Sequence, residues 1–307
     1  MLGPILGLIS AIAFGANSII TRRGMLRVSS NYMAIITVFT GPIFFLIIGG
    51  VTGDLFKIRQ IPLQAFVYLA LSGITHFALG RTWGYKSIQL IGSTRSNIVT
   101  SLNPVVTVIL AMIILRETIT LIMGIGILFT LVGPLLILLK EQVISDAVQL
   151  KANPHGKELA RSTLYKGIFY GIGAAIFWGS SAILIKLGLE HGGSSITGSF
   201  IAYLSASIAI SPSLFFNKDR REEILHGDKQ SLKIALFSGL TSNIAQLLRY
   251  IALGLGSAIV ISLMLRTMPL WVLSFAFIFN REYESFSRWV LLGNGFIILG
   301  AILIFLS

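Results

Sequence analysis

Three arginines, Arg81, Arg249 and Arg266, lie within long stretches of otherwise apolar residues. Such stretches can cross a bilayer, where an arginine costs about 2.5–3.5 kcal/mol on insertion scales unless it is hydrated or paired. A guanidinium presents five N–H donors in a planar fork, which matches a carboxylate or a phosphate. The arginines therefore predict a hydrated cavity that binds an anionic group. The alternative is that they donate hydrogen bonds to carbonyls and hydroxyls or reach an interface.

The acidic residues are not placed to neutralise these arginines. Each of the twelve lies in a loop or at the end of an apolar stretch. The compensating charge is therefore expected from a ligand, and the lack of a carboxylate inside the stretches argues against proton-coupled exchange of cations. The twelve are Asp54, Glu117, Glu141, Asp146, Glu158, Glu190, Asp219, Glu222, Glu223, Asp228, Glu282 and Glu284.

Other polar residues inside the stretches could complete a substrate site with the arginines. For the amides, the alternative is a hydrogen bond between helices, worth about 0.6 kcal/mol on average. Trp178 is either a stacking wall for substrate or a packing residue that faces lipid, and His76 is either a proton relay or a satisfied core histidine. The candidate substrate-binding residues are Arg81, Arg266, Arg249, Asn17, His76, Trp178, Asn103, Asn243 and Gln246.

Several kinds of chemistry have no support in the sequence. It contains no cysteine, which excludes disulfides and thiolate nucleophiles, and no Gly-x4-Gly-Lys-Ser/Thr motif for ATP. An enzyme within the membrane would need a cluster of acids, histidines or metal ligands at membrane depth. One histidine without carboxylates is not such a cluster, so we expect no catalytic residue, no metal site and no cofactor.

The composition is that of an integral membrane protein. Of 307 residues, 54% are hydrophobic and only 12% are charged, against about 25% charged in soluble domains. The apolar runs do not alternate with polar residues, so they predict helices and not barrel strands. The fold class is therefore all-α, with ten transmembrane helices near residues 3–20, 31–51, 65–90, 93–115, 121–139, 167–189, 194–216, 234–255, 257–279 and 289–306.

The two halves of the chain resemble each other at a nearly constant offset. Residues 7–15 match residues 171–179, and the segment from Pro104 to Glu117 has the same length as that from Pro269 to Glu282. Glycines 126 and 133 likewise match glycines 293 and 300. Residues 1–140 are therefore predicted as a first five-helix repeat, 141–166 as a cytoplasmic linker and 167–307 as a second repeat. An odd number of helices per repeat makes the second enter the membrane in the opposite direction.

The basic residues set the expected orientation. Seventeen of the 24 lysines and arginines fall on one side of the predicted spans and four on the other. The positive-inside rule places the seventeen in the cytoplasm and both termini outside. The net charge of +12 is thus explained by orientation, so we expect no nucleic acid partner. Short loops and the lack of a targeting segment favour a prokaryotic plasma membrane. The Arg-Glu pairs at 116–117 and 281–282 are expected to orient helix ends.

The order and spacing of these features resemble the drug/metabolite transporter superfamily, specifically its EamA-type members with ten helices in two repeats. The resemblance is carried by Gly15 with Arg22 and Gly24, by residues 178–179 with Lys186 and Gly188, and by the paired Pro…Arg-Glu segments with the glycines after them. It covers essentially the whole chain. Many relatives are thought to keep both termini in the cytoplasm, whereas the charge distribution here predicts the opposite.

The resemblance implies a secondary transporter that moves a small metabolite by alternating access. The arginines favour an anionic or zwitterionic metabolite, such as an amino acid, an organic acid or a phosphorylated metabolite. The alternatives are an exporter of neutral or cationic metabolites or drugs, a membrane-embedded enzyme and a structural membrane protein. The expected partners are a small-molecule substrate and membrane lipids, and a homodimer is left open.

Overall fold

The computed structural model describes residues 2–25, 27–133, 135–136, 161–225, 228–279 and 288–306. This part of the chain forms helices joined by short turns and contains no strand. Most of the predicted linker, residues 141–160, lies outside it. Its last six residues belong to a helix that begins at Arg161.

The helices of the first half follow the predicted spans with one clear difference. The predicted boundary between residues 90 and 93 lies inside a continuous helix, and the chain breaks later, at Ser101 and Leu102. The elements are α1 (Leu2–Met25), α2 (Ser30–Thr52), the 3-10 helix η1 (Asp54–Gln60), α3 (Leu63–Gly73), the π-helical turn η2 (Ile74–Gly80), α4 (Arg81–Thr100), α5 (Asn103–Leu110), the π-helical turn η3 (Ala111–Leu115) and a helix over Leu121–Gly133.

The second half begins with the longest of the described helices. This half consists of α7 (Arg161–Glu190), α8 (Ser195–Phe216), α9 (Lys218–Leu225), α10 (Lys229–Leu255), α11 (Ala258–Met264), the 3-10 turn η4 (Leu265–Thr267), α12 (Met268–Phe279) and α13 (Arg288–Leu306).

Six helical segments are long and apolar enough to cross a membrane. They are Leu2–Thr21, Asn31–Thr52, Leu63–Ile88, Ser162–Glu190, Ser195–Leu214 and Ala258–Phe275. Shorter apolar helices cover Asn103–Leu115, Leu121–Gly133 and Leu291–Leu306. Helix α10 is not among them because it carries many polar residues, although its 27 residues extend about 40 Å.

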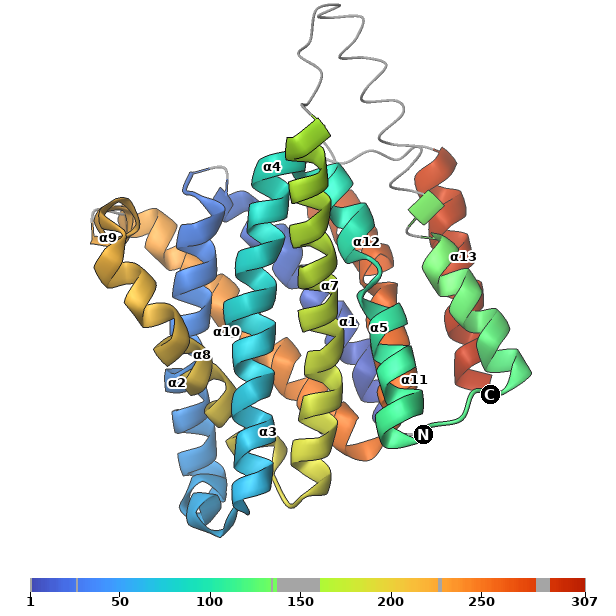
Figure 1. Ribbon diagram of the computed structural model, residues 1–307, viewed down its shortest axis with the longest axis horizontal. Helices are drawn as coiled ribbons and strands as arrows, with labels where there is room; N and C mark the ends of the chain where they lie inside the picture. The colour runs from blue at the N-terminus through green and yellow to red at the C-terminus, as the bar shows by residue number, and fades with distance from the viewer. Residues whose placement is uncertain are drawn as a thin grey trace, which may run out of the picture.

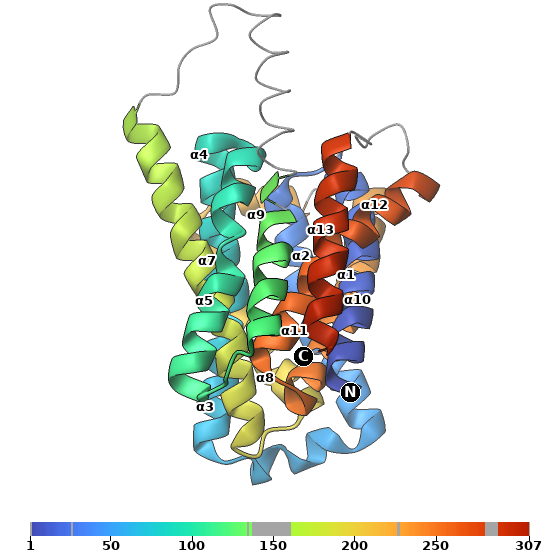
Figure 2. The same cartoon turned by 90° about the vertical axis from the view of Figure 1, so that its right-hand side faces the viewer.

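The helices form one bundle in which elements of the two halves pack against each other (Figure 1). Helix α1 packs mainly on α10, α4 on α7, and α2 on both α8 and α10. The start of α1 and the end of α13 lie at the same end of the bundle in both views (Figures 1 and 2). Large apolar side chains such as Ile43 and Ile208 are exposed on the outside, as expected for a surface that faces lipid.

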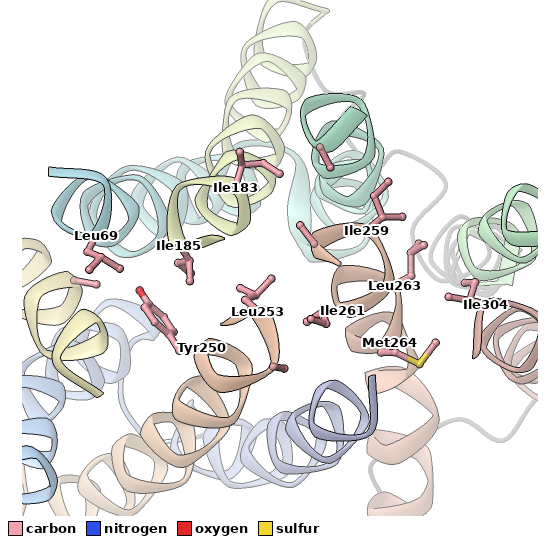
Figure 3. Packing of buried hydrophobic residues seen from close by; sticks show 14 of the residues in the cluster. Leu69, Ile183, Ile185, Tyr250, Leu253, Ile259, Ile261, Leu263, Met264 and Ile304 are labelled. Atoms are coloured by element: carbon pink, nitrogen blue, oxygen red, sulfur yellow. The ribbon is translucent and has the colours of Figure 1, made fainter. Parts of the chain in front are cut away.

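A cluster of buried apolar side chains holds the two halves together. Figure 3 shows Leu69 of α3, Ile185 of α7 and Tyr250 of α10 directed toward a common interior, with Ile261 of α11 nearby. The Tyr250 hydroxyl lies 3.2 Å from the Ser72 hydroxyl, so this polar group is satisfied within the apolar cluster.

In each half, a turn interrupts the regular α-helix shortly before a proline. Pro104 lies in the first turn of α5 and Pro269 in the first turn of α12. A proline is well tolerated at this position, because its missing N–H would have no partner within the helix. The preceding breaks fall at Ser101 and Leu102 in one half and at the turn η4 in the other. The breaks thus lie at equivalent positions of the two matching segments.

Polar contacts fix the ends of the helices. The Glu117 carboxylate accepts hydrogen bonds from the Ser257 hydroxyl at 2.6 Å and from the backbone N–H groups of Ala258 and Ile259 at 2.7 and 3.0 Å. It therefore caps the N-terminus of α11, where negative charge is favourable. This geometry agrees with the expected role of the first Arg-Glu pair. The second pair, at 281–282, lies outside the described residues.

The opposite end of the bundle carries contacts of the same kind. The Glu223 carboxylate accepts hydrogen bonds from the backbone and the hydroxyl of Ser29, which is the N-cap of α2. Asp228 is the N-cap of α10, and hydrogen bonds from Ser231 lower the pKa of its carboxyl group. Arg27 lies 3.9 Å from Asp228. The loop before α2 is thereby joined to α9 and to the start of α10.

The last helices of the two halves pack through glycines that match each other in sequence. A Cβ on Gly133 would lie 2.5 Å from the Gly293 carbonyl, and one on Gly300 would lie 2.6 Å from the Gly126 carbonyl. Helix Leu121–Gly133 and α13 therefore approach each other backbone to backbone, which only small residues allow.

The glycine contact leads to a stability prediction. Gly300→Ala should destabilise the protein by about 1–3 kcal/mol, because the new methyl group overlaps Gly126 and Thr130. Thermal unfolding of the purified protein in detergent measures this. Gly295→Ala is the matched control on α13, since nothing lies within 4 Å of its Cβ. Equal melting temperatures for both variants would contradict the contact.

The cap on α11 leads to a second prediction. Glu117→Ala should lower the stability by about 1–3 kcal/mol, because three donors lose their acceptor. Glu117→Gln keeps one oxygen acceptor and should cost less. The control is Glu190→Ala. This variant removes the ion pair between Lys186 and the half-exposed Glu190 carboxylate, so it should change the melting temperature little. A melting temperature of Glu117→Ala equal to that of the control would refute the cap.

Candidate functional site

A cavity of about 430 Å³ lies between the two halves, at the level of the breaks before α5 and α12. Its size suits a small metabolite. Eight of the nine residues predicted to bind substrate line it, and Asn243 is the exception. The described lining consists of Phe14, Asn17, Ser18, His76, Arg81, Asn103, Thr107, Trp178, Ala182, Ser242, Gln246, Arg249, Ser262, Leu265, Arg266 and Met268. We call it the central cavity.

Arg81 is the first residue of α4 and follows the π-helical turn η2. Its Nη1 donates hydrogen bonds to the Ala34 carbonyl at 3.2 Å and to the Thr37 hydroxyl at 3.1 Å, both on α2. The guanidinium also lies 5.4 Å from the centre of the Phe77 ring. These contacts use one nitrogen of the guanidinium for hydrogen bonding. The fork retains further N–H groups that can bind an anion.

Arg249 takes part in a network of neutral groups. Its guanidinium donates to the Gln246 side-chain oxygen at 3.4 Å and to the Ser181 hydroxyl at 3.2 Å. Because this fixes the Gln246 oxygen toward Arg249, the amide nitrogen faces His76 Nε2, at 3.3 Å. His76 Nε2 must then accept a hydrogen bond, which leaves the proton on Nδ1, 3.0 Å from Ser181. In this arrangement His76 is neutral and both ring nitrogens are satisfied, as in a core histidine.

Arg266 lies in the turn η4, between α11 and α12. Its Nη2 donates a hydrogen bond to the side-chain oxygen of Asn103, the first residue of α5. The two broken helices therefore meet at the cavity through a cation and an amide. Asn17 adds a second amide from α1. Its oxygen accepts hydrogen bonds from Ser238 and Thr241 at 2.9 Å each, and its NH₂ group makes no hydrogen bond within the described part of the chain.

Trp178 also forms part of the wall. Its indole N–H donates to the His76 carbonyl at 3.0 Å, and its ring lies against Gly80 and Gly84. The side chain thus packs inside the bundle while it lines the cavity. Asn243 is buried but turned away from the cavity, since its amide nitrogen donates to the Thr40 hydroxyl of α2 at 3.3 Å. The structure therefore leaves Asn243 outside the candidate site.

The charges of the central cavity are unbalanced. Three arginines line it, whereas the described lining contains no acidic residue. The hydrogen bonds of all three guanidinium groups end on neutral oxygens. Such bonds reduce the cost of burial but leave the mutual repulsion of the cations in place. An anionic group in the cavity would offset both. Among the described residues, no cluster of histidines and acids is suited to hold a metal ion.

Sequence reasoning missed several residues of the lining, although helical periodicity could have identified some. Ser242, Gln246 and Arg249 are spaced i, i+4 and i+7, which places them on one face of α10, whereas Asn243 lies about 100° away. The same rule connects Thr107 to Asn103 on α5. It also connects Phe14 to Asn17, Ala182 to Trp178 and Ser262 to Arg266, at separations of three or four residues. Ser18, Leu265 and Met268 carry no comparable signal, because small and apolar residues are common throughout the spans.

The comparison with solved structures shows the fold. One solved chain, whose title reads only "Crystal structure of protein", superposes with a TM-score of 0.76 over 99% of this chain and 96% of the other, at 13% identity. A search of curated proteins found no match.

The comparison with family models identifies the chain. The model described as EamA-like transporter family matches residues 1–139 and 165–306, which are the two halves recognised from their internal similarity. Members of this family are membrane transporters and not enzymes. The cavity between the halves and the apolar outer surface fit this match. The protein is a member of the EamA-like transporter family.

Proposed function

We propose that this protein is a secondary transporter of a small anionic or zwitterionic metabolite, such as an amino acid, an organic acid or a phosphorylated metabolite. The observation that carries the proposal is the gathering of Arg81, Arg249 and Arg266 in the wall of one cavity with neutral partners. Arginine binds carboxylates and phosphates bidentately, so each guanidinium can hold an anion while it keeps its present anchor.

The proposed architecture is a bundle of ten spans made of two inverted five-helix repeats. Support for ten spans comes from the six long helices, the three shorter apolar helices and α10. Support for the repeat comes from the family match to each half and from the breaks at equivalent positions. Two such units can rock around a fixed midplane site and so expose it to either side in turn. The donors from both halves at the cavity suit this mechanism.

The cavity chemistry favours anions over the alternative substrates. A cationic drug or metabolite would meet three like charges and no described carboxylate in the lining. A neutral substrate would leave those charges uncompensated. Asn17 and Asn103 can supply further hydrogen bonds to a carboxylate, and Trp178 can pack against the apolar part of the solute. These groups would hold an anion by its charge and select it by its shape.

A binding experiment tests the proposal. Purified protein is heated with L-glutamate, succinate or inorganic phosphate, and with glucose and spermidine as neutral and cationic comparators. An anion at 100 times its Kd stabilises the folded state by about 2.7 kcal/mol. At least one anion should raise the melting temperature, and the comparators should not. Stabilisation by spermidine alone, or by none of the anions, would contradict the proposal.

The arginines provide the matched variants. Arg266→Gln and Arg81→Gln should each weaken anion binding about 10–100-fold, because a hydrogen bond to a charged group contributes about 1.5–3 kcal/mol. Uptake of the same radiolabelled anion into liposomes should fall accordingly. Arg59→Gln is the control, since Arg59 lies in η1, is exposed and is distant in the chain from every lining residue named above. Wild-type binding by both cavity variants would rule out the assigned site.

The orientation is proposed from the distribution of basic residues, with both termini outside a prokaryotic plasma membrane. A C-terminal fusion to alkaline phosphatase should therefore be active, and one to green fluorescent protein should stay dark. Fusions to a chain truncated after Leu225, in the basic segment, should behave in the opposite way. A fluorescent C-terminal fusion would place the termini in the cytoplasm and reverse this orientation.

A further inference from the structure

A second cavity, of about 730 Å³, lies beside the central cavity. It is enclosed by α2, η2, α4, α7 and α8. Among the described residues, Arg81 alone lines both cavities. The polar part of the second wall consists of Asn31, Arg81, Thr82, Trp83, Tyr85, Lys86, Tyr170 and Ser213. We call this space the side cavity.

The side cavity extends from the middle of the bundle to one end of it. Its deepest residue along η2 is Ile74, whereas Asn31 lies in the first turn of α2 and Ser213 in the last turn of α8. Helix α8 packs on α3 and η2 but hardly touches α4. Figure 1 shows α8 and α4 diverging toward the end where α9 lies. The side cavity therefore reaches the end that carries Arg27, Asp228 and Lys229.

Two cationic side chains, Arg81 and Lys86, line the side cavity one after the other along α4. Lys86 follows Arg81 by five residues on α4, which corresponds to a rise of about 7.5 Å toward the end of the bundle. The described lining contains no acidic residue. The Ser213 hydroxyl in this wall is buried and has no hydrogen-bond partner among the described residues. Lys86, Arg81 and the arginines of the central cavity thus form a row of positive charge that runs inward.

We propose that the side cavity is the entrance for the anionic solute, which binds first near Lys86 and then passes to Arg81. This inference rests on the proposed function of the central cavity. Arg81 can contact the solute from both cavities, because the residue lines both and its guanidinium donates hydrogen bonds to α2 through a single nitrogen. A row of cations accelerates the arrival of an anion more than it tightens the final complex. The entrance should therefore control how fast the anion binds more than how tightly it is finally held.

The first test removes the charge of Lys86. Binding of the most stabilising of L-glutamate, succinate and inorganic phosphate is followed by stopped-flow tryptophan fluorescence, to which Trp178 in the central cavity contributes. Lys86→Gln should lower the association rate constant about tenfold and reduce its dependence on salt. Its dissociation rate constant should stay within about threefold of wild type. Lys57→Gln, an exposed lysine in η1, is the control and should leave both rates unchanged.

The second test narrows the entrance sterically. Ala209 lines the side cavity, whereas its neighbour Ile208 is 64% exposed on the outer surface and lines neither cavity. Ala209→Trp should slow association and dissociation by a similar factor of about ten, so that the Kd changes little. Ile208→Trp is the matched control for the added indole and should bind at wild-type rates.

The outcomes separate the two proposals. If the anion binds the wild type, is lost in Arg266→Gln and binds Lys86→Gln and Ala209→Trp at wild-type rates, the entrance is refuted and the central site stands. A phospholipid that copurifies with the wild type, is absent from Ala209→Trp and leaves the kinetics unchanged would likewise refute it, in favour of a lipid site. If no anion binds the wild type, both proposals fail together.

Discussion

Three guanidinium groups held inside an apolar bundle are the constraint on which the rest of this structure depends. Burial of each requires hydrogen-bond acceptors, and the protein supplies neutral ones from α2, α5, α7 and α10. Helices of both halves are thereby tied to the cavity by the groups that solvate its charges. The breaks before α5 and α12 also help to solvate a buried charge, because they bring Asn103 and Arg266 together at the level of the cavity.

Much of this arrangement could be predicted from the sequence, because bilayers impose simple rules. Long apolar runs had to be helices, and Arg81, Arg249 and Arg266 needed compensation that no acidic residue could provide. The gathering of eight predicted residues around one cavity follows from that need. The family match confirms the resemblance found from spacing alone. The role of these residues in binding substrate stays a prediction.

Other features depend on packing that no local pattern encodes. Helix α4 continues across the expected boundary, where it packs along α7. Packing also decides which face of α10 meets the cavity, since Gln246 lines it while Asn243, on another face, donates to Thr40. The side cavity lies where α8 and α4 have few contacts with each other, and the tilt of a span cannot be read from its length or composition.

The contact between helix Leu121–Gly133 and α13 has a practical consequence for imaging the molecule. These two helices contribute no described residue to either cavity, and their glycine contact joins them backbone to backbone. A 33.4 kDa membrane-spanning chain offers little mass for particle alignment in electron microscopy. A rigid fiducial continued from α13 as an unbroken helix would rest on a part of the protein that lines neither cavity among its described residues. It could thus report the orientation of each particle while transport proceeds undisturbed.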